Sequence, residues 1–166
     1  MTIKNIIKFK KICDLLNIET NAKEDFYQRL ILQKLFYFLQ KLGLDLEIKY
    51  NFYKYGPYSP DLTDIYYTIM ELSEQDFNYF PEIKLTDEEM KIINKLNNIY
   101  IKWGNNIDKL EFYASVLYIY TDMYVKNQNK ECIKKIVNNF KPKLYIKFNF
   151  EEVLEELKVQ GFLNLC

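Results

Sequence analysis

The stretch that decides the fold is RLILQKLFYFLQKLGLDLEIKYNFYKYGPYSPDLTDIYY, residues 29–67. Its first part, over 27–42, is apolar on nearly every side and leaves a narrow polar stripe that includes Gln33 and Lys34. A helix of this composition is normally the central helix of a core. It is too short and too interrupted to span a membrane, which takes about 20 mostly apolar residues. The sequence therefore predicts a central core helix that ends at Gly43.

The second part of the stretch predicts a strand, a turn and another helix. Apolar and polar residues alternate over 47–54, which is typical of a half-buried strand. The Gly-Pro pair at 56–57 is a turn signal. Ser59 followed by a proline fits an N-cap and the first position of a helix. We therefore expect a helix over about 60–72.

The rest of the chain alternates apolar periodicity with helix-capping signals. Helical patterns cover the ranges 3–16, 86–103, 108–124, 129–140 and 149–160. Capping boxes or N-caps are expected at Asn21 with Glu24, Thr86 with Glu89, Asp108 with Glu111, Asn129, and Asn149 with Glu152. A mixed apolar stretch at 77–85 is expected to pair with 47–54 as a short ribbon, with Pro81 restricting it to an edge.

These elements predict a mainly α fold: a compact multi-helix domain with a small two-stranded β ribbon, over residues 1–166 as a single domain. A helical core with a ribbon also has the outline of a winged helix. In that alternative, 47–55 and 77–85 would form the wing and one helix would read DNA.

Two segments carry a resemblance to a known family. LQKLFYFLQ at 32–40, followed by FYKYGPYSPDL at 52–62, resembles the YwgA-like proteins and the related Panacea (SocA-like antitoxin) domain. The segments at 110–120 and 140–163, with a Leu-Glu helix, a Lys-Pro pair and a closing amphipathic helix, are similar to the YwgA-like pattern. The resemblance covers most of residues 25–163. It implies a helical fold and an antitoxin-type role in which the chain neutralises a protein partner.

The sequence lacks the residues and motifs of several common catalytic and metal- or nucleotide-binding sites. The chain has no histidine, which is the commonest general base near neutral pH and the commonest metal ligand. Neither a Rossmann glycine motif nor a P-loop occurs. Cys13, Cys132 and Cys166 are too far apart for a metal-binding pair, and the first two are expected to be buried thiols. We therefore expect a non-enzymatic protein that needs no metal and no cofactor.

The net charge and the N-terminal residues indicate the class of partner and the cellular location to expect. Lys plus Arg and Asp plus Glu are both 23, which gives no net charge and is unlike a typical basic DNA-binding domain. Lys4, Lys8 and Lys10 interrupt the N-terminal apolar run, so no signal peptide is indicated. The expectation is a cytoplasmic protein without a membrane partner.

The tyrosine-rich turn is the first candidate site. In one interpretation its rings cover the edge of the core and Ser59 caps a helix. In the other, its rings form an exposed aromatic surface that binds a protein partner, because rigid amphipathic rings are frequent interface anchors. The candidate partner-binding residues are Tyr53, Lys54, Tyr55, Gly56, Pro57 and Tyr58. The polar side chains Gln33 and Lys34 are expected to satisfy buried backbone groups of this turn.

A basic segment is the second candidate site. Its lysines would contact nucleic-acid phosphates without reading sequence, and they are Lys126, Lys130, Lys134, Lys135, Lys141, Lys143 and Lys147. The chain has one arginine, Arg29, so bidentate guanine readout is weakly supported. The leading hypothesis is a regulatory protein that binds a protein partner, which the resemblance implies is a toxin. The alternative is a winged-helix-like DNA-binding regulator.

Overall fold

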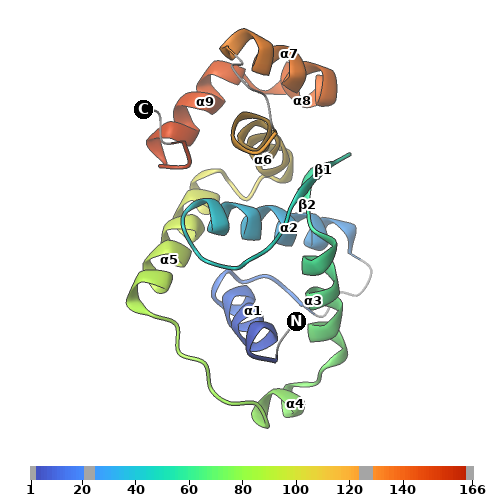
Figure 1. Ribbon diagram of the computed structural model, residues 1–166, viewed down its shortest axis with the longest axis vertical. Coiled ribbons are helices and arrows are strands. Elements are labelled where there is room, and N and C mark those ends of the chain that lie inside the picture. Colours follow the sequence, from blue (N-terminus) through green and yellow to red (C-terminus); the bar gives the residue numbers. More distant parts are fainter. Residues whose placement is uncertain (1–2, 21–24, 124–128, 164–166) are drawn as a thin grey trace.

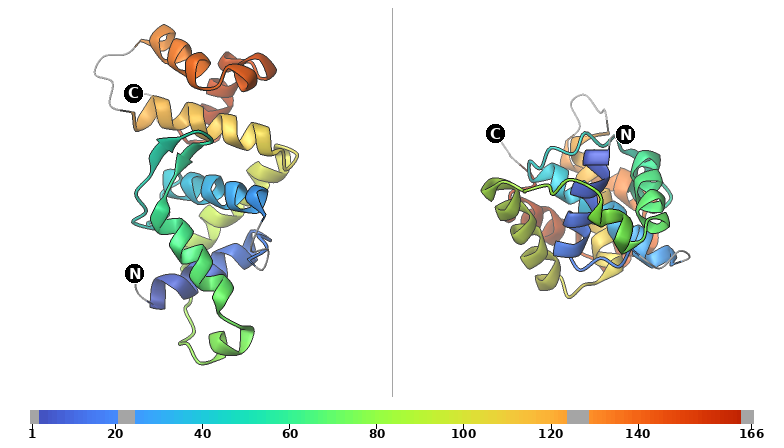
Figure 2. Two further views of the ribbon diagram at one scale, coloured as in Figure 1. Left: turned by 90° about the vertical axis from the view of Figure 1, so that its right-hand side faces the viewer. Right: turned by 90° about the horizontal axis from the view of Figure 1, so that it is seen from below.

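The computed structural model describes residues 3–20, 25–123 and 129–163, and there the chain is mainly helical with one small ribbon (Figures 1 and 2). The described elements in chain order are α1 (Ile3–Leu15), α2 (Phe26–Lys41), β1 (Asn51–Tyr53), β2 (Gly56–Tyr58), α3 (Pro60–Glu71), α4 (Glu74–Asn78), α5 (Asp87–Lys102), α6 (Ile107–Thr121), α7 (Lys130–Phe140), α8 (Pro142–Lys147) and α9 (Phe150–Val159). The predicted fold class is confirmed.

Helix α2 is the centre of the structure. It crosses the middle of the molecule, with α1 below it, α6 above it and α3 and α5 at its sides (Figure 1). Its apolar side chains are buried on almost every side, and Leu35, Phe36, Phe38 and Leu39 are completely inaccessible to solvent. Helices α7, α8 and α9 pack on the far side of α6. The all-round apolar pattern of α2 thus correctly predicted its central place.

Most helix starts follow their predicted caps. Ser59 accepts a hydrogen bond from the Leu62 amide, and a proline begins α3. Thr86 and Glu89 form the predicted capping box of α5. Asn129 and Asn149 accept amide hydrogen bonds at the starts of α7 and α9. These short polar side chains satisfy amides that have no partner inside the helix.

Helix α6 starts differently from the prediction. Its N-cap is Asn106, which accepts a hydrogen bond from the Lys109 amide, and no Asp108–Glu111 box forms. Asp108 lies inside the first turn of the helix, and the Glu111 carboxylate accepts a hydrogen bond from Lys141 instead of from a backbone amide. The box predicted at Asn21 and Glu24 lies outside the described residues, and the N-cap of α2 is Asp25.

The ribbon forms from different residues than expected. Strands β1 and β2 pair antiparallel as a hairpin, with Phe52 opposite Pro57. The predicted partner, 77–85, instead begins in α4, which Ser73 and Asp76 start with a capping box, and then runs without regular structure. The pairing of 47–54 with 77–85 is therefore wrong, and so is the wing that the winged-helix alternative built from it.

The cysteines divide between core and surface. Cys13 is buried as predicted, whereas Cys132 is exposed because it lies on the outward side of α7. Cys166 lies outside the described residues. Over the described ranges, no helix has both the length and the apolar character that a membrane crossing requires.

Candidate functional site

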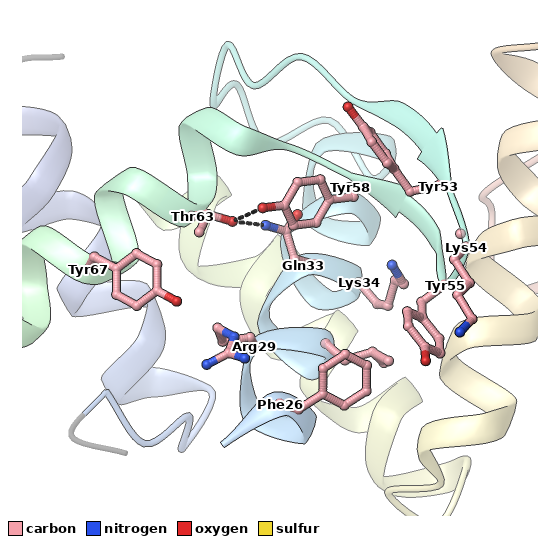
Figure 3. A pocket seen from close by; sticks show the side chains of 12 residues that line it. Phe26, Arg29, Gln33, Lys34, Tyr53, Lys54, Tyr55, Tyr58, Thr63 and Tyr67 are labelled. Carbon is pink, nitrogen blue, oxygen red and sulfur yellow. Dashed lines mark hydrogen bonds between the residues drawn. The ribbon is translucent and has the colours of Figure 1, made fainter. Parts of the chain in front are cut away.

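A pocket of about 460 Å³ lies between α2, the hairpin and the start of α3 (Figure 3). Its volume falls within the range of about 300–1,000 Å³ usual for small-ligand sites. The residues that line it are Phe26, Arg29, Leu30, Gln33, Lys34, Tyr53, Lys54, Tyr55, Gly56, Tyr58, Thr63 and Tyr67. The tyrosine-rich turn therefore forms one wall of a pocket.

One face of α2 forms the base of the pocket. Residues 26, 29, 30, 33 and 34 share this face because they follow helical spacing. Thr63 and Tyr67, four residues apart on α3, form the side opposite Tyr55 in Figure 3. The pocket thus joins three elements that are separate in the sequence.

Gln33 fastens the end of the hairpin to α2. Its side-chain amide donates to the Ser59 carbonyl at 2.9 Å, and its side-chain oxygen accepts from the Ser59 amide at 2.9 Å. The same amide donates to Thr63 Oγ1, which lies 2.9 Å from Tyr58 Oη (Figure 3). Both backbone groups of a fully buried residue are satisfied by this one side chain.

Two buried lysines hold the turn of the hairpin. Lys34 Nζ donates to the Pro57 carbonyl at 2.5 Å. Lys141 Nζ donates to the Lys54 carbonyl at 2.5 Å and to Glu111 Oε1 at 2.6 Å. Two backbone carbonyls of the hairpin, one in the turn and one in β2, are therefore bonded by lysine ammonium groups.

The segment that leads into the hairpin is held in the same way. Gln40 makes a pair of hydrogen bonds with the backbone of Ile48, at 2.9 and 3.0 Å. Tyr118 on α6 donates to the Tyr50 carbonyl at 3.3 Å. The prediction that polar groups of the α2 stripe satisfy the turn is confirmed, and the hairpin is fixed by side chains along its length.

We call the hydrogen bonds of Gln33, Lys34 and Lys141 to the backbone of the hairpin and of Ser59 the hairpin clamp. The bonds of Gln33 lead to a prediction. Gln33→Leu keeps the size of the side chain but leaves the buried amide of Ser59 without a partner, whereas the Ser59 carbonyl keeps its bonds from Thr63. Because each orphaned buried group costs about 1–3 kcal/mol, we expect a loss of about 2 kcal/mol in the free energy of unfolding. Urea unfolding followed by circular dichroism measures it.

The matched control for Gln33→Leu is Gln28→Leu. Gln28 is on the same helix, and within the described part of the chain its side chain forms no hydrogen bond. It should change the urea midpoint little. Equal midpoints for the two variants would contradict the structural role given to Gln33.

Large exposed rings gather at the mouth of the pocket. Tyr53 is 49% exposed, Phe26 40%, Tyr67 41% and Tyr55 39%. The rings of Phe26 and Tyr55 meet edge to face at 4.9 Å, and those of Tyr53 and Tyr58 at 5.2 Å. Ring packing of this kind keeps exposed aromatic side chains in defined positions.

The six predicted partner-binding residues divide by exposure. Tyr53, Lys54 and Tyr55 are exposed and Tyr58 is half-buried. Gly56 and Pro57 are buried, because the hairpin packs against α6 there, although Gly56 still lines the pocket. Lys54 Nζ lies over the Tyr55 ring, 5.2 Å from its centroid. Exposed and buried residues therefore follow one another closely in this turn.

Lys34 is the buried charge of the site. Its side chain is almost fully enclosed, and this burial lowers the pKa of its amine to about 7, although the nearby carboxylate of Glu111 opposes the change. Burial also lowers the pKa of Lys141, again against Glu111. A buried lysine with a lowered pKa beside a pocket is a frequent mark of a functional site.

The basic segment is partly neutralised. Lys130 and Lys134 both pair with Glu151, and Lys147 pairs with Asp108 at 2.6 Å. Lys141 is buried in the hairpin clamp. Lys135 and Lys143 are exposed and, within the described ranges, have no ion pair, while Lys126 lies outside them. Four of the seven lysines thus already have carboxylate partners.

Some pocket residues were missed by the sequence reading. Phe26, Leu30, Thr63 and Tyr67 were not predicted as site residues. The available signal was the helical spacing of Phe26 and Leu30 with Lys34, which places all three on one face of α2.

Comparison of the chain with protein-family models, with curated proteins and with solved structures finds no match.

Proposed function

We propose that this chain is a non-enzymatic regulatory protein that binds a protein partner through the aromatic pocket. The observation that carries the proposal is the gathering of four large exposed rings around one cavity. Aromatic anchors of this kind dominate the energy of many interfaces. Neutralisation of a toxin, which the family resemblance implies, is the form of regulation that we propose.

The clamp beneath the rings supports this proposal. Hydrogen bonds from Gln33, Lys34 and Lys141 hold the backbone that carries Tyr53 and Tyr55. A surface held in its binding conformation loses little conformational entropy when a partner docks. The arrangement therefore suits recognition of a partner by a preformed surface.

The test begins with capture of partners from native cell extract at low and high salt. A retained protein is then purified, and its affinity for wild type and for Tyr55→Ala is measured by calorimetry. Truncation of an anchor at the mouth should weaken binding about 10- to 100-fold, since hot-spot residues contribute about 2 kcal/mol or more. The melting temperature should change little.

The control variant is Tyr79→Ala. Tyr79 is 87% exposed, follows α4 and does not line the pocket. Its loss should leave affinity unchanged. Equal affinities for wild type and Tyr55→Ala would refute this site, and retention of nucleic acid at low salt alone would favour the DNA-binding alternative.

A further inference from the structure

The charges around the pocket are of one sign. Arg29, Lys34 and Lys54 line it, and no aspartate or glutamate is among the described residues that do. Glu111 acts on Lys34 electrostatically, but its carboxylate is bonded to Lys141 and does not line the pocket. An apolar, aromatic cavity with three basic residues is complementary to an anionic group carried on an apolar body.

Lys34 has unused donors. In the described part of the chain, Lys34 Nζ bonds to one acceptor, the carbonyl of Pro57. A protonated amine has three N–H donors, so two are left for a ligand. The residue is only 2% exposed and lines the pocket, so its side chain belongs to the wall of the cavity. Hydrogen bonds from a buried ammonium to a carboxylate are about twice as strong as neutral ones.

We propose that the pocket binds the carboxyl-terminal residue of the partner polypeptide, with its carboxylate on Lys34 and an aromatic side chain against the exposed rings at the mouth, those of Phe26, Tyr55 and Tyr67. This inference rests on the proposed function and names the part of the partner that the pocket takes. Capture of a chain end by backbone or cationic groups is a known mode of peptide recognition.

A chain end suits this cavity better than an internal acidic side chain. One terminal residue supplies both the carboxylate for the basic groups and a ring for the aromatic walls. An internal aspartate or glutamate supplies the carboxylate alone and leaves the rings of Phe26 and Tyr67 uncovered. The cavity volume of about 460 Å³ is ample for a whole residue.

Binding of a carboxylate would also stabilise the protonated form of Lys34. Burial lowers the pKa of Lys34 to about 7, so the free protein holds this amine near the midpoint of its titration at neutral pH. A carboxylate beside the amine favours its protonated form. The ligand would therefore bring a carboxylate into a pocket whose described lining has none.

Three peptides test the proposal on the wild-type chain. The first is acetyl-Ala-Ala-Phe with a free carboxylate, the second is the same peptide as its carboxamide, and the third is acetyl-Ala-Glu-Phe carboxamide. Titrations are followed by the amide NMR signals of Tyr53, Tyr55 and Gly56. We expect the free acid to bind with a Kd of about 1 mM. Both carboxamides should bind at least about tenfold more weakly.

Two lysine variants identify the contact. Lys34→Met should remove the preference for the acid over the amide. Lys135→Met, a change of an exposed lysine on α7 outside the pocket, should keep it. If Lys34→Met fails to fold, the wild-type comparison of acid and carboxamide still decides. Equal binding of these two, binding led by the internal glutamate, or no binding of the acid would overturn the proposal.

These outcomes are separate from those of the partner test. A partner that loses affinity with Tyr55→Ala, combined with no preference for the free acid, would keep the proposed function and reject the terminal carboxylate. A preference for the free acid without a Tyr55-dependent protein partner would do the reverse.

Discussion

Replacing Gly56 with alanine is expected to destabilise the protein by about 3 kcal/mol, because the new methyl group meets α6 and strains the turn. A Cβ at this position would lie 2.5 Å from Ser115 Oγ, well inside contact distance. The residue also has φ of +85°, a conformation that costs side chains energy. Urea unfolding measures the loss, and partner affinity should fall as well, since Tyr55 and Pro57 flank this residue.

Two further variants separate the causes of that loss. Gly104→Ala has a similar φ of +71° with no atom within 4 Å, so it should show the backbone cost alone, about 1 kcal/mol. In Gly56→Ala combined with Ser115→Ala, the clashing oxygen is gone and the next contact is an ordinary 3.6 Å. The double variant should be destabilised by less than the sum of its single changes. Strict additivity would show that the close approach to α6 is not the cause.

The helices could be predicted because their causes are local. The all-round apolar pattern of α2 required a central place, and Ser59 and Thr86 start helices with their own side chains. The start of α6 was predicted two residues too late, because Asn106 is also a good N-cap residue and the Glu111 side chain bonds to Lys141, 30 residues away in the sequence.

The hairpin could not be predicted from its own residues. Strands of three residues show too little alternation to identify their partner. The Gly-Pro pair at 56–57 was interpreted as a turn, whereas both residues belong to β2. Distant side chains support the hairpin: Lys34 and Lys141 bond to carbonyls of the hairpin, and Gln33 and Tyr118 bond to the residues that flank it. Such long-range polar contacts leave no periodic signal in the sequence.

Only part of the candidate site could be predicted, because the pocket also depends on contacts between residues that are distant in the sequence. The tyrosines at 53, 55 and 58 were recognised from their position in the turn, and the pocket beneath them depends on the packing of α3 against α2. Lys141 was predicted to be a surface residue, and that prediction was wrong. It was grouped with surface lysines by sequence proximity, but it is buried against Glu111 and the hairpin.

The free energy of unfolding of the wild type is expected to rise relative to that of Lys34→Met as the pH increases from 7 to about 9.5. Burial lowers the pKa of Lys34 from 10.5 to about 7 in the folded protein. Between these values the unfolded chain binds more protons than the folded chain, so stability increases with pH. One such group gives a slope of up to about 1.4 kcal/mol per pH unit.

The comparison with Lys34→Met isolates this effect from other titrations. Lys141 and Glu111 also face Lys34, and both remain in the variant. Burial raises the pKa of tyrosines such as Tyr50 and Tyr66, which lowers stability at still higher pH in both proteins. The variant also orphans the Pro57 carbonyl, which shifts its stability by an amount that does not depend on pH. The difference between the two unfolding curves should therefore grow with pH, and parallel curves would mean that Lys34 is fully charged in the folded protein at every pH tested.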